Sequence, residues 1–140
     1  MAVRSRLPRI LVAEDDPAIR RLLGTTLRRR RLDVTLAADG QEAIDALQRE
    51  RFDAMVMDLM MPRVTGWDLI QWLGSHPERR PGSVVVVSAA DREAIQGLDP
   101  SIVNAIIFKP FDVLQLGAYV RNAACAGKPD RRRARPLRTI

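Results

Sequence analysis

Two residue types that build many protein sites are almost missing: among 140 residues there is one cysteine, Cys125, and one histidine, His76. A lone cysteine excludes an internal disulfide, and without a Cys/His cluster the usual zinc sites are excluded as well. Long apolar runs are also missing, so neither a membrane-spanning helix nor a secretory signal is expected. These absences predict a cytoplasmic protein.

Positive charge is concentrated at the end of the sequence. The net charge is +6, and residues 126–140 contain a single acid. The basic residues of this tail are Lys128, Arg131, Arg132, Arg133, Arg135 and Arg138. Prolines and a triple arginine predict that the tail is disordered. A contact with nucleic acid through this tail is a secondary hypothesis.

The rest of the sequence predicts one domain. Its length suits a single compact unit, and 46% hydrophobic residues can form a core. We divide the sequence into a basic N-terminal segment (1–8), a domain (9–125) and the basic tail (126–140).

Five short apolar runs recur along the domain, at residues 10–13, 34–37, 54–57, 84–87 and 105–108. Most lack polar alternation, which is typical of parallel strands covered by helices on both faces. Asp16, Asp39 and Asp112 are candidate N-caps of intervening helices, and another helix is expected at 67–73. A fourth helix at 91–98 is expected to be short or distorted because of Gly97 and Pro100. Alternation of strands and helices predicts an α/β fold with a doubly wound, five-stranded parallel sheet.

Polar side chains follow four of the runs. Glu14 and Asp15 follow the first, Asp58 the third, Ser88 the fourth and Lys109 the fifth. Ligands of doubly wound sheets bind at the carboxyl ends of the strands. In a sheet of order 2-1-3-4-5 the first and third strands are neighbours, so the three carboxylates are expected to lie close together.

Three adjacent carboxylates repel one another, and one lysine does not balance them. All the candidate ligands are oxygens, which favours a hard divalent cation, and Mg²⁺ fits best. A carboxylate beside Mg²⁺, an ammonium and a hydroxyl is the donor set of a phosphoryl-transfer site, in which aspartate can be the covalent acceptor.

Four motifs together resemble the response-regulator receiver family, which has a flavodoxin-like (βα)5 fold. They are residues 10–17, residues 57–62 with Gly66, residues 87–89 and residues 108–111, in the order and at nearly the spacing of that family. The resemblance covers about residues 8–125. It implies a signalling domain that catalyses only its own phosphorylation and dephosphorylation, with a histidine kinase or a phosphotransfer protein as donor.

The resemblance also implies roles at the acidic end of the domain. Asp58 would be the phosphoacceptor. Asp15, Asp58 and the backbone carbonyl of Met60 would bind Mg²⁺, and Glu14 would act through a coordinated water.

Ser88 and Lys109 would contact the phosphoryl group, and the bond between Lys109 and Pro110 is expected to be cis. Phosphorylation would switch a contact surface for an output protein, formed by the segment 91–98, the strand 105–108 and the last helix. One position departs from the family: Ile106 stands where an aromatic switch residue is usual.

Four interpretations follow. The first is a stand-alone phosphoacceptor, and the second is a receiver-fold interaction module that works without phosphorylation, which the departure at Ile106 favours. The third is a Mg²⁺-dependent hydrolase with an aspartyl nucleophile. It would need a second aspartate where Met60 stands, and a cap domain that the sequence lacks. Nucleic-acid binding through the tail is the fourth.

Overall fold

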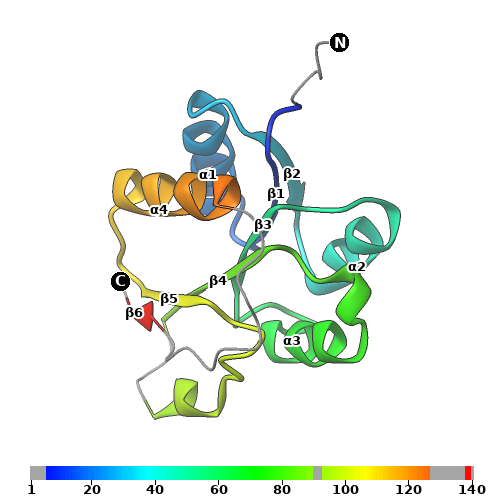
Figure 1. The fold of residues 1–140 in the computed structure, drawn as a ribbon. Coiled ribbons are helices and arrows are strands. Elements are labelled where there is room, and N and C mark those ends of the chain that lie inside the picture. Colours follow the sequence, from blue (N-terminus) through cyan, green and yellow to red (C-terminus); the bar gives the residue numbers. More distant parts are fainter. Residues whose placement is uncertain (1–5, 90–92, 127–137, 140) are drawn as a thin grey trace.

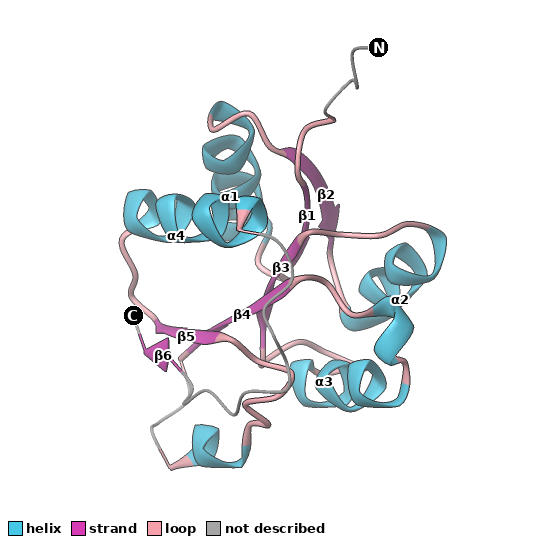
Figure 2. Ribbon diagram, in the orientation of Figure 1, coloured by secondary structure: helices cyan, strands magenta, loops and turns pink. Residues whose placement is uncertain are grey.

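The computed structural model describes residues 6–89, 93–126 and 138–139. The described part forms a parallel sheet between two layers of helices, with α1 and α4 on one face and α2 and α3 on the other (Figures 1 and 2). The strands are β1 (Arg9–Ala13), β2 (Asp33–Ala37), β3 (Ala54–Asp58), β4 (Ser83–Ser88), β5 (Ala105–Phe108) and β6 (Arg138–Thr139). The helices are α1 (Pro17–Arg29), α2 (Gly40–Arg49), α3 (Gly66–Ser75) and α4 (Val113–Cys125), with 3-10 turns η1 (Pro77–Arg79) and η2 (Ala94–Gly97).

The sheet order is β2-β1-β3-β4-β5-β6. The predicted five-stranded parallel sheet of order 2-1-3-4-5 is therefore confirmed, with one short strand added at its edge. The central strands β3 and β4 are buried along their whole length. Alternate strand residues pack into two cores, one under α2 and α3 and one under α1 and α4. No helix in the described ranges has the length and apolar character that crossing a membrane requires.

Side chains that accept hydrogen bonds from free N–H groups start the helices. Asp16 and Asp112 each accept two of these bonds at the first turns of α1 and α4, and Asp39 accepts one at α2. These three predicted caps are confirmed. At α3, Thr65 and Asp68 form a reciprocal capping box that was not predicted from the sequence.

In the described part of the expected fourth helix, residues 93–98, the structure has a single 3-10 turn, η2. Its expected cap, Asp91, lies outside the described residues. The turn ends at Gly97, and Pro100 follows, which lacks the N–H that a continuing helix would need. The prediction of a short or distorted element is confirmed for the described residues 93–98, which contain no α-helical turn.

The tail adds a strand that the sequence did not predict. Arg138 and Thr139 pair in parallel with Ala105 and Ile106. An edge strand presents unpaired N–H and C=O groups, and a strand that follows a helix returns naturally to the next position of a parallel sheet. The expected disorder does not hold for these two residues. Residues 127–137 and 140 are outside the described part, so for them disorder stays a prediction.

The start of α3 lies against the end of β3. A Cβ atom at Gly66 would lie 2.4 Å from the carbonyl oxygen of Asp58 and 2.5 Å from the Cα of Leu59. Both contacts are with backbone, which cannot rotate away as a flexible side chain can. Only glycine therefore allows the helix to start this close to the strand end.

We predict that Gly66→Ala lowers the free energy of unfolding by about 2 kcal/mol, because the added methyl group forces the backbone apart. The matched control is Gly97→Ala, where a Cβ would meet nothing within 4 Å. It should change stability by less than about 0.5 kcal/mol. Urea denaturation of both variants measures the difference, and equal losses would contradict the packing argument.

Candidate functional site

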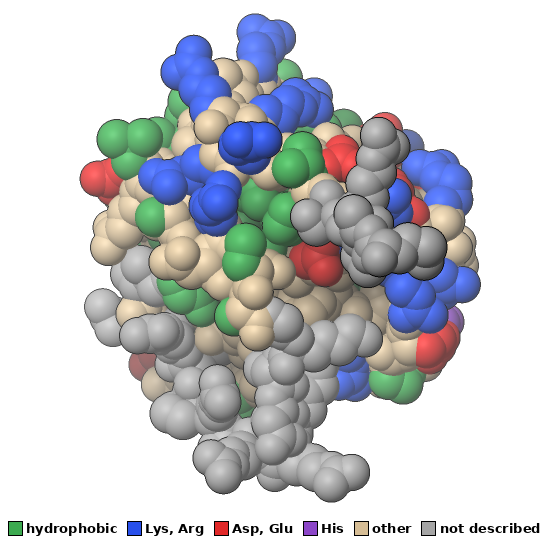
Figure 3. Space-filling view, turned by 45° about the horizontal axis from the view of Figure 1, so that its top comes forward, with side chains coloured by type: hydrophobic (Ala, Val, Ile, Leu, Met, Phe, Trp, Pro, Cys, Tyr) green, Lys and Arg blue, Asp and Glu red, His purple; other side chains and the backbone are tan. Residues whose placement is uncertain are grey.

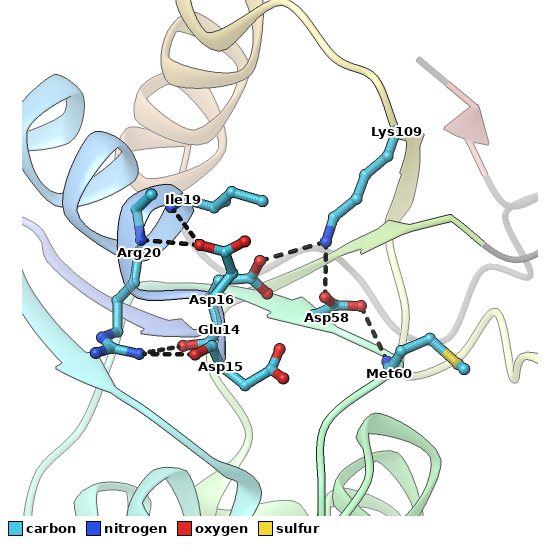
Figure 4. Close-up of polar contacts among 9 residues, drawn as sticks. Glu14, Asp15, Asp16, Ile19, Arg20, Asp58, Met60 and Lys109 are labelled. Carbon is cyan, nitrogen blue, oxygen red and sulfur yellow. Dashed lines mark hydrogen bonds and ion pairs between the residues drawn. The ribbon is translucent and has the colours of Figure 1, made fainter.

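The carboxyl ends of β1 and β3 bring three acids together. Residue 13 of β1 is in register with residue 57 of β3, so Glu14 and Asp58 follow at the same level of the sheet. Asp15 comes next on the loop to α1. Carboxylate oxygens of these three residues all lie within 4.8 Å of one another. The predicted cluster is confirmed, and Figure 4 shows its side chains at the ends of the two strands.

The three acids differ in how far they are buried. Glu14 is 3% exposed and Asp58 is 4% exposed, whereas Asp15 is exposed. In the absence of a metal, burial raises the pKa of Glu14 to about 7, and hydrogen bonding and like-charge repulsion from Asp58 add to the rise. Lys109 opposes this shift only in part. The site therefore holds more negative charge than its own residues neutralise.

Lys109 comes from the loop after β5 and contacts both buried acids. Its Nζ lies 2.8 Å from Oδ2 of Asp58 and 3.3 Å from Oε1 of Glu14. Burial alone would lower the pKa of the ammonium, but hydrogen bonds and attraction from Asp58 and Glu14 outweigh it and raise the pKa. Lys109 therefore stays charged. The peptide bond between Lys109 and Pro110 is cis, as predicted.

The loop after β3 fixes the other side of Asp58. Oδ1 of Asp58 accepts a hydrogen bond of 2.9 Å from the backbone N–H of Met60. The N–H of Gly66 donates to the carbonyl of Leu59 at 3.0 Å, which closes the loop. The side chain of Met60 points away from the carboxylates (Figure 4) and the residue is 63% exposed.

A cation that sequence reasoning missed supports the acidic loop from α1. Nη1 of Arg20 donates to the carbonyl oxygens of Glu14 at 2.9 Å and Asp15 at 3.2 Å. Arg20 lies one helical turn after the cap Asp16, and this position directs its side chain back toward the loop. That spacing is the only signal that could have identified it.

Two further predicted residues lie on the strands that follow β3 in the sheet, Ser88 on β4 and Ile106 on β5. Asp58 is in register with Val87, and the fully buried Ser88 comes next on β4. Ile106 is also fully buried, and packs in the core under α2 and α3. Its register partner on β4 is Val86, two residues before Ser88.

The donor set at this site suits a divalent cation. Three carboxylates supply only oxygen ligands, and one ammonium leaves them with excess negative charge. Hard ions such as Mg²⁺ prefer this chemistry, because they bind through a few carboxylates and keep several waters. An acidic triad of this kind is typical of the Mg²⁺ site of receiver domains.

Comparisons with known proteins agree with the geometry. The model of the response regulator receiver domain matches residues 10–121. The response regulator MprA of Mycobacterium leprae is 36% identical over 122 residues, which are 87% of this chain and 53% of that protein. The chain thus spans about half the length of this curated relative.

Solved structures show the same fold. The receiver domain of the Francisella response regulator 1452 is 31% identical, with a TM-score of 0.77, covering 85% of this chain and 98% of that one. The response regulator TrrA of Thermotoga maritima, solved in complex with Mg²⁺–BeF, is 22% identical, with a TM-score of 0.72 and coverage of 84% and 99%.

The family model matches most of the domain and includes all three acids of the cluster. The chain therefore belongs to the response-regulator receiver family and is a phosphoacceptor signalling domain rather than a conventional enzyme.

Proposed function

We propose that Asp58 accepts a phosphoryl group from a histidine kinase or a phosphotransfer protein, with Mg²⁺ held by the acidic cluster. The observation that carries the proposal is the convergence of Glu14, Asp15 and Asp58 with the ammonium of Lys109 at one sheet edge. Receiver domains as a family interact with histidine kinases. The proposal concerns this domain, whatever the identity of its output protein.

Asp15, Asp58 and the carbonyl of Met60 would hold the ion, with Glu14 acting through a bound water. When present, Mg²⁺ would offset the negative charge of the phosphoryl oxygens. The metal would also neutralise the acids, which otherwise repel one another. In this assignment Met60 binds the ion through its backbone. The hydrogen bond from its N–H to Asp58 already holds that backbone in place.

In the transfer, a carboxylate oxygen of Asp58 attacks the phosphorus of a phosphohistidine. The new O–P bond forms as the P–N bond breaks, and the imidazole leaves with the electron pair of that bond. Lys109, now 2.8 Å from Asp58, would neutralise charge on the phosphoryl oxygens. The Ser88 hydroxyl would donate a hydrogen bond to one of them.

Phosphorylation would then change the surface formed by η2, β5 and α4, which an output protein would bind. Ser88 and Lys109 connect the phosphoryl group to β4 and to the loop after β5. The output protein contacts this surface in only one of two states. Converting a 1:99 population into 99:1 takes about 5.5 kcal/mol of differential stabilisation.

A second candidate function is an interaction module that works without phosphorylation. The buried aliphatic Ile106, at a position where the family usually has an aromatic switch residue, and the short turn η2 favour it. The complete set of acids and Lys109 favours the phosphoacceptor instead. A phosphorylation experiment distinguishes these functions.

We predict that incubation with acetyl phosphate and Mg²⁺ adds one phosphoryl group, measured by intact mass. EDTA should abolish the gain because the acids repel the donor without the metal. Asp58→Asn should abolish it because the acceptor oxygen is lost. No gain from acetyl phosphate or from a cognate kinase, with folding and Mg²⁺ binding intact, would overturn the phosphoacceptor proposal.

We also predict that Glu14 makes metal-free stability depend on pH. The pKa of about 7 in the folded protein exceeds the ordinary value of 4.5, so the native state binds the proton more tightly. The resulting stability is fully present below pH 4.5 and is lost as the pH rises through about 7. Complete ionisation of Glu14 lowers the free energy of unfolding by roughly 3 kcal/mol, since each pKa unit corresponds to about 1.4 kcal/mol.

Glu14→Gln removes this titration. In EDTA its free energy of unfolding should exceed that of the wild type by an amount that grows between about pH 5 and about pH 8. Added Mg²⁺ should stabilise the wild type more than the variant, since the variant loses one carboxylate. Glu78→Gln, at an exposed position, is the matched control. Parallel pH curves for Glu14→Gln and wild type would contradict the assignment.

A further inference from the structure

One face of the molecule has an unusual charge composition. Residues 17–32, which include α1, and residues 113–126, which include α4, contain no acid and seven arginines. These are Arg20, Arg21, Arg28, Arg29, Arg30, Arg31 and Arg121. We call this layer the α1–α4 face. Figure 3 shows basic side chains gathered at the top of the molecule, the part that α1 and α4 occupy in Figure 1.

None of these seven arginines forms an ion pair within the described ranges. The described ion pairs all use other cations: Arg6 and Arg9 at the N-terminal end, Arg63 beside α2, and Lys109 in the acidic site. The charge of the α1–α4 face is therefore uncompensated, whereas these other cations have carboxylate partners.

Several of these guanidinium groups are held in place by neutral acceptors. Arg28 donates to the carbonyl of Val34 at 3.3 Å, and Arg30 donates to the carbonyl of Leu114 at 3.2 Å. Arg121 donates to the carbonyl of Arg30. Each bond restricts the side chain without cancelling its charge, so less freedom is lost when an anion binds.

The packing of the two helices contributes to this arrangement. A Cβ at Gly117 of α4 would lie 2.8 Å from Nε of Arg30. Glycine at this position lets the guanidinium lie across α4 and reach the carbonyl of Leu114. The close packing of α1 and α4 at Gly117 thus positions the side chain of Arg30 as well as the hydrophobic core beneath the helices.

The chemistry of the face favours phosphate as its ligand. All seven cations are arginines, whose planar fork matches phosphate oxygens and remains charged at every physiological pH. Most apolar side chains of α1 and α4 pack against the sheet. The large apolar side chains that these helices expose are single leucines, Leu22 on α1 and Leu114 on α4, so neither helix presents a continuous apolar side to a bilayer. A repeating line of phosphates at the surface matches several fixed charges at once.

We propose that the α1–α4 face binds the phosphate backbone of nucleic acid. The run Arg28–Arg31 lies at the opposite end of α1 from the cap Asp16, across a helix of 13 residues, roughly 20 Å long. Apart from Arg20, whose guanidinium contacts the acidic loop, the face can therefore bind without the acidic site. The acids at that site repel phosphates and leave the α1–α4 face as the side that nucleic acid approaches.

The test measures the fluorescence anisotropy of a short labelled DNA duplex over a range of salt concentrations. The variant is Arg21→Gln/Arg29→Gln/Arg31→Gln, since these three side chains are exposed and make no described contact. The charge-matched control is Arg49→Gln/Arg51→Gln/Arg79→Gln. Arg49 ends α2, Arg51 follows it, and Arg79 ends η1. Circular dichroism spectra of both variants should match that of the wild type, which checks that they remain folded.

The face variant should weaken binding on the order of tenfold or more and reduce the salt slope by about one for each phosphate that it no longer neutralises. The control should bind almost as the wild type does. Equal weakening in both variants would overturn the proposal, because net charge alone would explain it.

The same measurements in a chain truncated after Gly127 separate the face from the basic tail. The face variant should still weaken binding in the truncated chain. Loss of all binding on truncation would overturn the proposal in favour of the tail. Binding to vesicles of anionic phospholipid without binding to DNA would overturn it in favour of a membrane surface.

Asp58→Asn separates this proposal from the proposed function. DNA binding should be the same in the wild type and in Asp58→Asn, and the face variant should still gain a phosphoryl group from acetyl phosphate. A DNA affinity that requires Asp58 would overturn the independence of the two sites.

Discussion

The structure depends on one electrostatic constraint: Glu14 and Asp58 are buried side by side, and a single ammonium contacts both. Such an arrangement requires β1 and β3 to be neighbours, and it requires β5 to end where Lys109 can reach across β4. The backbone N–H of Met60 and the guanidinium of Arg20 hold the loops that carry the acids. Strand order, loop contacts and charge balance therefore depend on one another, and a change in one of them disturbs the others.

The sequence predicted the features that local patterns encode. Uninterrupted apolar runs identified five central strands, and Asp16, Asp39 and Asp112 identified helix starts, because both signals lie within a few residues. The acidic cluster followed from the polar residues at strand ends. Pairing of Thr139 with Ile106 was missed because it joins residues far apart in the sequence. The contacts of Arg20 were missed because bonds from arginine to backbone carbonyls leave no composition signal.

The region around β5 combines several departures from the expected pattern. The described part of the preceding segment holds only the turn η2, and the outer edge of the strand is paired with Arg138 and Thr139. Ile106, which is buried, stands where the family usually has an aromatic residue. A smaller helix offers less packed surface whose rearrangement can separate two states. Pairing with β6 also occupies backbone N–H and C=O groups at the outer edge of β5, so these groups are not available to a partner. Packing and strand pairing around β5 therefore differ from those of a receiver with a full helix and an aromatic residue here.

Met60 combines a constrained backbone with an unconstrained side chain. Its N–H is bound to Asp58, while its side chain is mostly exposed beside the acidic site. Substitutions at this position can alter the shape and polarity that an approaching protein meets, and leave the groups that surround the acids unchanged. The hydrogen bond from residue 60 to Asp58 uses the backbone and does not depend on the side chain. Evolution can therefore vary the surface beside the acids at this residue without removing that contact.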